Sequence, residues 1–152
     1  METRYKVSDI MTRKPATIKP GKTVKDACVS MKELGVGSLL VVEKNTLKGL
    51  LTEKDIVTQV SSTDAKASSF NVEDIMTKAK DLITTTSNQD IDVAIMLMKD
   101  NDVRRLPVVD NEELVGIITS KDILKIEPAL FEHVYDNLQL REEDRKLELL
   151  KR

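Results

Sequence analysis

The pattern of apolar and polar positions divides the chain into two similar halves. Each half has apolar residues at helical spacing, then two short apolar runs separated by a polar turn, then Thr-x-x-Asp and an apolar pair. Residues 24–57 align with residues 91–124 without a gap, and residues 7–12 (VSDIMT) match residues 72–77 (VEDIMT). A duplication of this extent predicts two copies of one structural unit.

The periodicity predicts the order strand, helix, strand, strand, helix in each unit, which is an α/β fold. We expect the two units to pack as a pseudo-two-fold pair, each with a three-stranded sheet and two helices. Gly35 should end the first long helix, since a left-handed residue is favoured there. The expected helices are 24–34, 54–60, 91–99 and the one beginning near 120, and the expected strands are 16–18, 39–42, 47–51, 106–109 and 114–118. The strand pairs should form antiparallel hairpins, with turns at 43–45 and 110–111.

These patterns divide the chain into four segments: a first unit over 1–60, a linker over 61–71, a second unit over 72–126 and a helical appendage over 127–152. The linker is rich in Ser, Ala and Asp and has no apolar period. Each unit alone is small for a stable core, so sheet should pack against sheet. The appendage has Pro128 in its first turn, and it should pack on the core or on another subunit, or leave its last turns in solvent.

Composition narrows the class of protein. The net charge is −2 and only four residues are aromatic, which disfavours a nucleic-acid partner. The one cysteine, Cys28, occupies an apolar helical position, as expected for a core residue in a reducing compartment. The N-terminus is polar and no apolar run approaches the roughly 20 residues of a membrane span. We therefore expect a cytoplasmic protein without a signal peptide or membrane segment.

The repeated Thr-x-x-Asp motif, Thr52 with Asp55 and Thr119 with Asp122, has two compatible interpretations. As structure, the threonine caps a helix and the acid in the first turn favours the positive end of the helix dipole. As chemistry, a helix N-terminus suits phosphate and a neighbouring carboxylate can accept both hydroxyls of a ribose. The motif alone leaves both open.

The combination of DIMT at the start of each unit, LPVVD at 106–110, and GLLTEKD and GIITSKD at 49–55 and 116–122 resembles a tandem pair of cystathionine-β-synthase (CBS) domains, also called a Bateman module. The match runs from Val7 to about Ile126. The resemblance implies a regulatory module that senses adenosine-containing ligands, namely AMP, ADP, ATP or S-adenosylmethionine, in two clefts between facing sheets. It implies no required cofactor.

The resemblance also implies which residues bind. The motif acids Asp55 and Asp122 would hold ribose, and Thr52 and Thr119 would hold phosphate. Extended segments near Thr17 and Thr84 would line the base pocket through their backbone. The remaining candidates lead into the second strand of each unit: Val36, Gly37 and Ser38, and Val103, Arg104 and Arg105.

The two clefts should differ, because Arg104 and Arg105 align with Gly37 and Ser38. Paired guanidinium groups suit phosphate, unless they belong to a solvated turn. Strand alternation predicts that at most one of them points into a cleft, unless the turn is irregular.

No enzyme is expected, because the chain has no nucleophile-elbow, phosphate-loop or dinucleotide motif. The single histidine, His133, has no surrounding ligand cluster, so no metal site is expected either. A ligand-free dimerisation or adaptor module is the alternative function. In both cases we expect a homodimer, the commonest closed symmetry.

Overall fold

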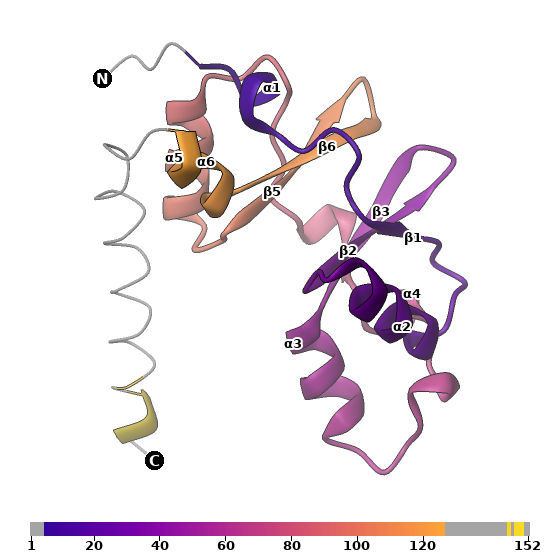
Figure 1. Ribbon diagram of the computed structural model, residues 1–152. Coiled ribbons are helices and arrows are strands. Elements are labelled where there is room, and N and C mark those ends of the chain that lie inside the picture. The colour runs from indigo at the N-terminus through magenta and orange to yellow at the C-terminus, as the bar shows by residue number, and fades with distance from the viewer. Residues whose placement is uncertain (1–4, 127–145, 147, 151–152) are drawn as a thin grey trace.

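The computed structural model describes residues 5–126, 146 and 148–150 (Figure 1). The expected helix over 127–152, with His133, lies almost wholly outside these residues. The α-helices are α1 (Val7–Ile10), α2 (Val24–Leu34), α3 (Glu53–Ile56), α4 (Val72–Ile75), α5 (Ile91–Asp100) and α6 (Ser120–Ile126). The strands are β1 (Thr17–Ile18), β2 (Ser38–Glu43), β3 (Thr46–Thr52), β4 (Thr77–Lys78), β5 (Arg105–Asp110) and β6 (Glu113–Thr119). Short helical segments η1 (Val57–Ser61), η2 (Ala67–Ser69) and η3 (Ala79–Asp81) complete the fold.

Helix α2 begins and ends where the sequence predicts. At its start, the Thr23 hydroxyl accepts a hydrogen bond from the Asp26 amide at 3.1 Å, and the Asp26 carboxylate accepts one from the Thr23 amide at 3.0 Å. At its end, Gly35 has a φ of 64°, the left-handed conformation that glycine adopts without strain. Val24, Ala27 and Met31 face the core, and half-buried Cys28 packs beside them.

Both expected hairpins form, β2 with β3 and β5 with β6, each with a register shift at equivalent positions. The first turn has positive φ at Lys44 and Asn45. The prediction for the second turn was wrong by one residue, because the positive φ values fall at Asn111 and Glu112. Asp110 remains in the strand, paired with Glu113, and its carboxylate accepts the Ser87 amide at 2.9 Å.

The prediction of a three-stranded sheet in each unit was also wrong. The first sheet has four strands in the order β1-β2-β3-β4, and the second has only β5 and β6. In the first unit the Leu40 amide donates to Ala16, which holds β1 against β2. The equivalent of Leu40 is Pro107, which has no N–H to donate, so the corresponding contact shrinks to a single bridge between Thr85 and Val108.

The two units exchange their first helical turns. Val7 of α1 is buried in the core of the second unit together with Ile91 and Ile118. Val72 of α4 is buried in the core of the first unit beside Val24. In Figure 1, α1 accordingly lies beside α5 and α6, and α4 lies near α2. The units are therefore interlocked, and neither core is complete without a segment from the other half of the chain.

The hairpins pack face to face, as the small size of each unit predicts. Leu40, Leu47 and Leu50 of the first sheet form a buried cluster that contacts Leu114 and Ile117 of the second. The hairpin ends also meet, since the Leu114 amide donates to the Asn45 carbonyl at 2.9 Å. This packing leaves a cleft on each side of the shared sheet-to-sheet core.

The end of the first unit differs from the expected helix and linker in two respects. The helix expected over 54–60 is α only as far as Ile56 and then widens into the π-helical segment η1. The linker is not detached from the fold, because half-buried Phe70 packs on the first core and its carbonyl accepts the Val24 amide at 2.9 Å.

Candidate functional site

Both Thr-x-x-Asp motifs form the same closed hydrogen-bond pattern where a strand passes into a helix. Asp55 Oδ2 accepts the Thr52 amide at 2.9 Å and the Thr52 hydroxyl at 3.0 Å, and the Asp55 amide donates to the Thr52 hydroxyl at 3.3 Å. Asp122 and Thr119 repeat the pattern at 2.9, 2.8 and 3.3 Å. The capping interpretation of the motif is therefore confirmed for both copies.

The cap uses only half of each carboxylate. Asp55 and Asp122 engage Oδ2 alone, and within the described residues nothing donates to either Oδ1. Both acids are half-buried, and the cap leaves the Oδ1 acceptor of each unused. An ionised carboxylate oxygen accepts hydroxyl groups strongly, which is the chemistry that a ribose diol needs.

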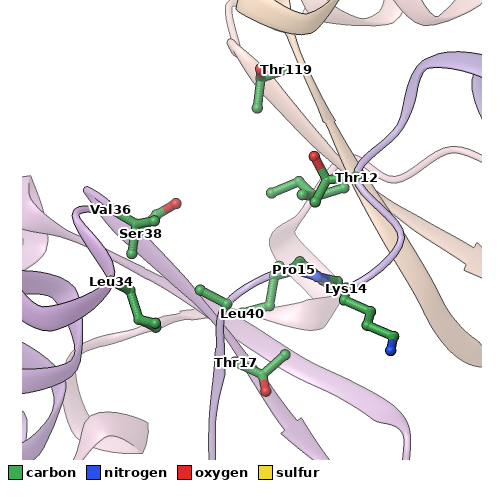
Figure 2. Close-up of a pocket in the computed structure, with 11 residues that line it drawn as sticks. Thr12, Lys14, Pro15, Thr17, Leu34, Val36, Ser38, Leu40 and Thr119 are labelled. Atoms are coloured by element: carbon green, nitrogen blue, oxygen red, sulfur yellow. The ribbon is translucent and has the colours of Figure 1, made fainter.

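One cleft, called the Thr119 cleft below, has a volume of about 570 Å³. Thr119 comes from the second unit, whereas Thr17, Val36 and Ser38 come from the first, and Figure 2 shows them around one space. The complete lining is Thr12, Lys14, Pro15, Ala16, Thr17, Leu34, Val36, Ser38, Leu40, Ile117 and Thr119. The cleft is therefore built by both units together.

The pseudo-symmetric counterpart, the Thr52 cleft, has a volume of about 770 Å³. Here the motif threonine comes from the first unit, and Val103, Arg104 and Arg105 come from the second. Other lining residues are Gly37, Leu50, Glu53, Lys54, Thr77, Asp81, Leu82, Ile83, Asp102, Pro107 and Glu148. Most residues of the Thr119 cleft have their counterpart in this lining, for example Thr12 in Thr77 and Ala16 in Ile83.

Not every candidate lines a cleft. Asp55 and Asp122 are outside both linings, and each is hydrogen-bonded to the hydroxyl of the motif threonine that does line a cleft. Thr84 is also outside, and its neighbours Leu82 and Ile83 line the Thr52 cleft instead. The other nine candidates divide as follows: Thr17, Val36, Ser38 and Thr119 line the Thr119 cleft, and Gly37, Thr52, Val103, Arg104 and Arg105 line the Thr52 cleft.

The clefts differ in charge. Lys14 is the one charged residue that lines the Thr119 cleft. The Thr52 cleft brings together three basic and four acidic residues: Lys54, Arg104 and Arg105 with Glu53, Asp81, Asp102 and Glu148. The sequence predicted the arginines of this cleft but not its acids.

Both Arg104 and Arg105 line the cleft, the case that the prediction reserved for an irregular turn. Arg104 lies in the bend before β5, where strand alternation does not yet apply. Arg105 is half-buried, and this burial, together with the Arg104 charge, lowers the pKa of its guanidinium, while Glu53 acts in the opposite direction. Neither arginine forms an ion pair with a described acid.

Sequence reasoning also missed Thr12, Lys14 and Pro15, which line the Thr119 cleft. These residues follow α1, and the repeated DIMT string marks this segment as part of each unit. Nothing in the string shows that the segment packs against the other unit. Within residues 5–126 and the short described C-terminal stretch, no cluster of three or more His, Cys, Asp or Glu could hold a metal. Nor does any described helix have the length and apolar character needed to span a membrane.

Comparison with known proteins agrees with this architecture. The family model described as "CBS domain" matches residues 7–62 and again residues 72–128. The chain is 35% identical over 117 residues to the CBS domain-containing protein YhcV of Bacillus subtilis, covering 77% of this chain and 81% of that protein. A protein of Methanopyrus kandleri is 34% identical over 140 residues, covering 91% of this chain and 70% of its own length.

Among solved structures, the chain is similar to the CBS domain pair of protein MJ0100 in complex with 5′-methylthioadenosine and S-adenosyl-L-methionine. The TM-score is 0.69 at 26% identity, and the match covers 80% of this chain and 94% of the other. A conserved protein from Pyrococcus horikoshii superposes with a TM-score of 0.72 at 28% identity, covering 82% and 93% of the two chains.

Proposed function

The chain belongs to the CBS domain family, and from that premise we propose that it is a non-enzymatic regulatory module that binds adenosine-containing ligands in its two clefts. One observation carries the proposal. In each cleft, the threonine of a Thr-x-x-Asp cap from one unit lies opposite the turn and extended segment of the other unit. Each cap also leaves one carboxylate oxygen unused. The Thr23–Asp26 cap of α2 leaves the same oxygen unused but borders neither cleft, so the facing cleft is what distinguishes the two Thr-x-x-Asp caps.

The ligand class is AMP, ADP, ATP or S-adenosylmethionine. The MJ0100 complex supports an adenosine-type ligand in a fold of this kind. Asp55 and Asp122 would accept the ribose hydroxyls through their unused Oδ1 atoms. The Thr52 and Thr119 hydroxyls now donate to their aspartates at 3.0 and 2.8 Å, so each must turn its single proton outward to bind phosphate.

The Thr52 cleft is the better candidate for a phosphorylated ligand. Arg104 and Arg105 both line it, and a pair of guanidinium groups binds a phosphate through several charge-assisted hydrogen bonds. The Thr119 cleft offers small Ser38 at the position of Arg105, and Lys14 as its charge. We therefore expect the two clefts to differ in affinity, with the Thr52 cleft favouring AMP over adenosine.

Isothermal titration calorimetry with AMP, ADP, ATP, adenosine and S-adenosylmethionine tests the function directly. At least one should bind, and at 100 times its dissociation constant it should stabilise the protein by about 2.7 kcal/mol in a thermal melt. If none of the panel binds or shifts the melt, the nucleotide-sensing function is wrong.

A second candidate function is a ligand-free dimerisation or adaptor module. It is favoured by exposed apolar side chains on the helices, with Leu34 at 58%, Val57 at 59% and Met96 at 58% exposure. Burying these side chains against a second copy would form a homodimer with an isologous interface. Light scattering at micromolar concentration should give the mass of a dimer. The appendage over 127–152, which could pack on another subunit, lies almost wholly outside the described residues.

A further inference from the structure

The Thr52 cleft adjoins a second hollow with a volume of about 860 Å³. Gly37, Glu53 and Arg105 line both spaces, so they lie at the boundary between them. The second hollow is also lined by Lys32 of α2 and Lys121 of α6. A phosphate chain that extends beyond the arginines toward these lysines meets this boundary.

Glu53 lies at this boundary, and its backbone is fixed there. It is the first residue of α3, and its amide donates to the Gly37 carbonyl at 3.0 Å. The carboxylate lies against the same glycine, because a Cβ at Gly37 would come within 3.1 Å of Glu53 Oε2. The glycine therefore leaves the space that the acid occupies.

The acid is specific to this cleft. At the equivalent positions of the second unit, Gly37 is replaced by Arg104 and Glu53 by Ser120, which is buried with 9% exposure. The same backbone bond is present there, from the Ser120 amide to the Arg104 carbonyl at 2.9 Å. The two units therefore share this backbone arrangement. In the first unit the small residue is Gly37 and the charged one is Glu53, whereas in the second unit the charged residue is Arg104 and the small one is Ser120. As a result, Glu53 lines the Thr52 cleft together with both arginines, and the second unit supplies no acid at the equivalent position.

We propose that Glu53 is a specificity-determining residue that limits the phosphate number of the ligand in the Thr52 cleft. The inference rests on the proposed function. Arg104 and Arg105 can neutralise one phosphate, which favours a nucleoside monophosphate. The second and third phosphates would approach the Glu53 carboxylate at the boundary before reaching Lys32 and Lys121, and like charges repel there.

The test compares AMP with ATP by calorimetry, in buffer without divalent cations, on Asp122→Ala and on Asp122→Ala with Glu53→Gln. The Asp122→Ala background weakens the Thr119 cleft, so that the Thr52 cleft dominates the signal. Glu53→Gln should raise ATP affinity by about three- to tenfold and change AMP affinity by less than about twofold. The gain should shrink as salt rises, because screening weakens the repulsion.

Two controls separate a local effect from a change in total charge. Glu43→Gln makes the same charge change at the exposed end of β2, outside both clefts, and should leave the ATP to AMP affinity ratio unchanged. In an Asp55→Ala background, where the Thr119 cleft dominates, Glu53→Gln should also leave the ratio unchanged. Thermal melts confirm that every variant is folded.

The outcomes are distinguishable. If wild type binds none of the five ligands of the calorimetry panel, the proposed function itself fails. If it binds another member of the panel but neither AMP nor ATP, the function stands and the role of Glu53 is wrong. If both bind but the ratio is the same with Glu53→Gln, or if AMP and ATP affinities rise equally, the role of Glu53 is wrong. A fall in ATP affinity would also overturn it, because that result would mean that Glu53 helps to hold the longer phosphate chain.

Discussion

Gly116→Ala is the substitution that most directly tests the exchange of helical turns between the units. Gly116 lies in β6 where the chain leaving α1 crosses it, and an added Cβ would come within 2.7 Å of the Thr12 carbonyl oxygen and 2.9 Å of Met11 Sδ. The methionine side chain can rotate away. The Thr12 carbonyl belongs to the backbone, so the crossing segment itself must move.

The energetic cost follows from the bonds that hold this segment. The Thr12 amide donates to Ile117 at 2.8 Å, and the Ile117 amide donates to Thr12 at 3.0 Å. Displacing Thr12 weakens both, and each is worth about 0.5–1.5 kcal/mol, so we expect Gly116→Ala to lower the free energy of unfolding by about 1–3 kcal/mol. Overpacking of a tight site has a cost in the same range of about 1–3 kcal/mol.

Equilibrium unfolding in urea measures this loss. Gly21→Ala is the matched control, because nothing lies within 4 Å of its added Cβ, and it should stay within about 0.5 kcal/mol of wild type. The equivalent change in the first unit, Gly49→Ala, would place a Cβ 2.5 Å from the Thr77 carbonyl and should cost at least as much. If Gly116→Ala is as stable as Gly21→Ala, the α1 segment does not cross β6 as described.

Three further predictions concern the cap, the arginines and a helix end. In calorimetry, Asp122→Ala should weaken AMP binding at the Thr119 cleft by more than it lowers stability in urea. The N-terminal acid contributes about 0.3–1 kcal/mol to its helix, whereas each lost ribose bond is worth about 1.5–3 kcal/mol. An unchanged affinity of the Thr119 cleft would mean that the motif is only a cap there. Arg104→Gly with Arg105→Ser should lose the preference for AMP over adenosine and most of its salt dependence, and retention of both would make the arginines ordinary surface charges. Gly35→Ala should cost about 1 kcal/mol in the same unfolding assay, since its φ of 64° strains any side chain, and a neutral result would mean that the helix end can rearrange.

Features set by local interactions could be predicted from the sequence. The bounds of α2 follow from Thr23, Asp26 and Gly35, which act on neighbouring backbone. Both hairpins follow from apolar runs around a short polar turn, and both Thr-x-x-Asp caps from residues three apart. In each case the determining contacts lie within a few residues, so the sequence contains the whole interaction.

The exchange of α1 and α4 could not be predicted, because residues 7–12 and 72–77 are nearly identical strings. Each would fit either core, and the choice depends on the path of the chain rather than on side chains. For the same reason the acids of the Thr52 cleft were missed, since Asp81 and Glu53 come from different units. The missing third strand of the second sheet could have been predicted from Pro107, because proline has no N–H to donate to that strand.

The exchange also predicts how the protein unfolds. Val7 and Val72 have no exposed area, and each is buried in the core of the unit opposite to its own sequence half. Unfolding one unit therefore removes a buried segment from the other, so both should unfold in one transition. Val72→Ala should cost about 1.5–3 kcal/mol and lower the hydrogen-exchange protection of β3 and β6 amides equally, although Val72 contacts only the first core. Val7→Ala is the mirror variant and should give the same result through the second core. A loss of protection confined to β3 in one variant and to β6 in the other would mean that the units unfold independently despite the exchange.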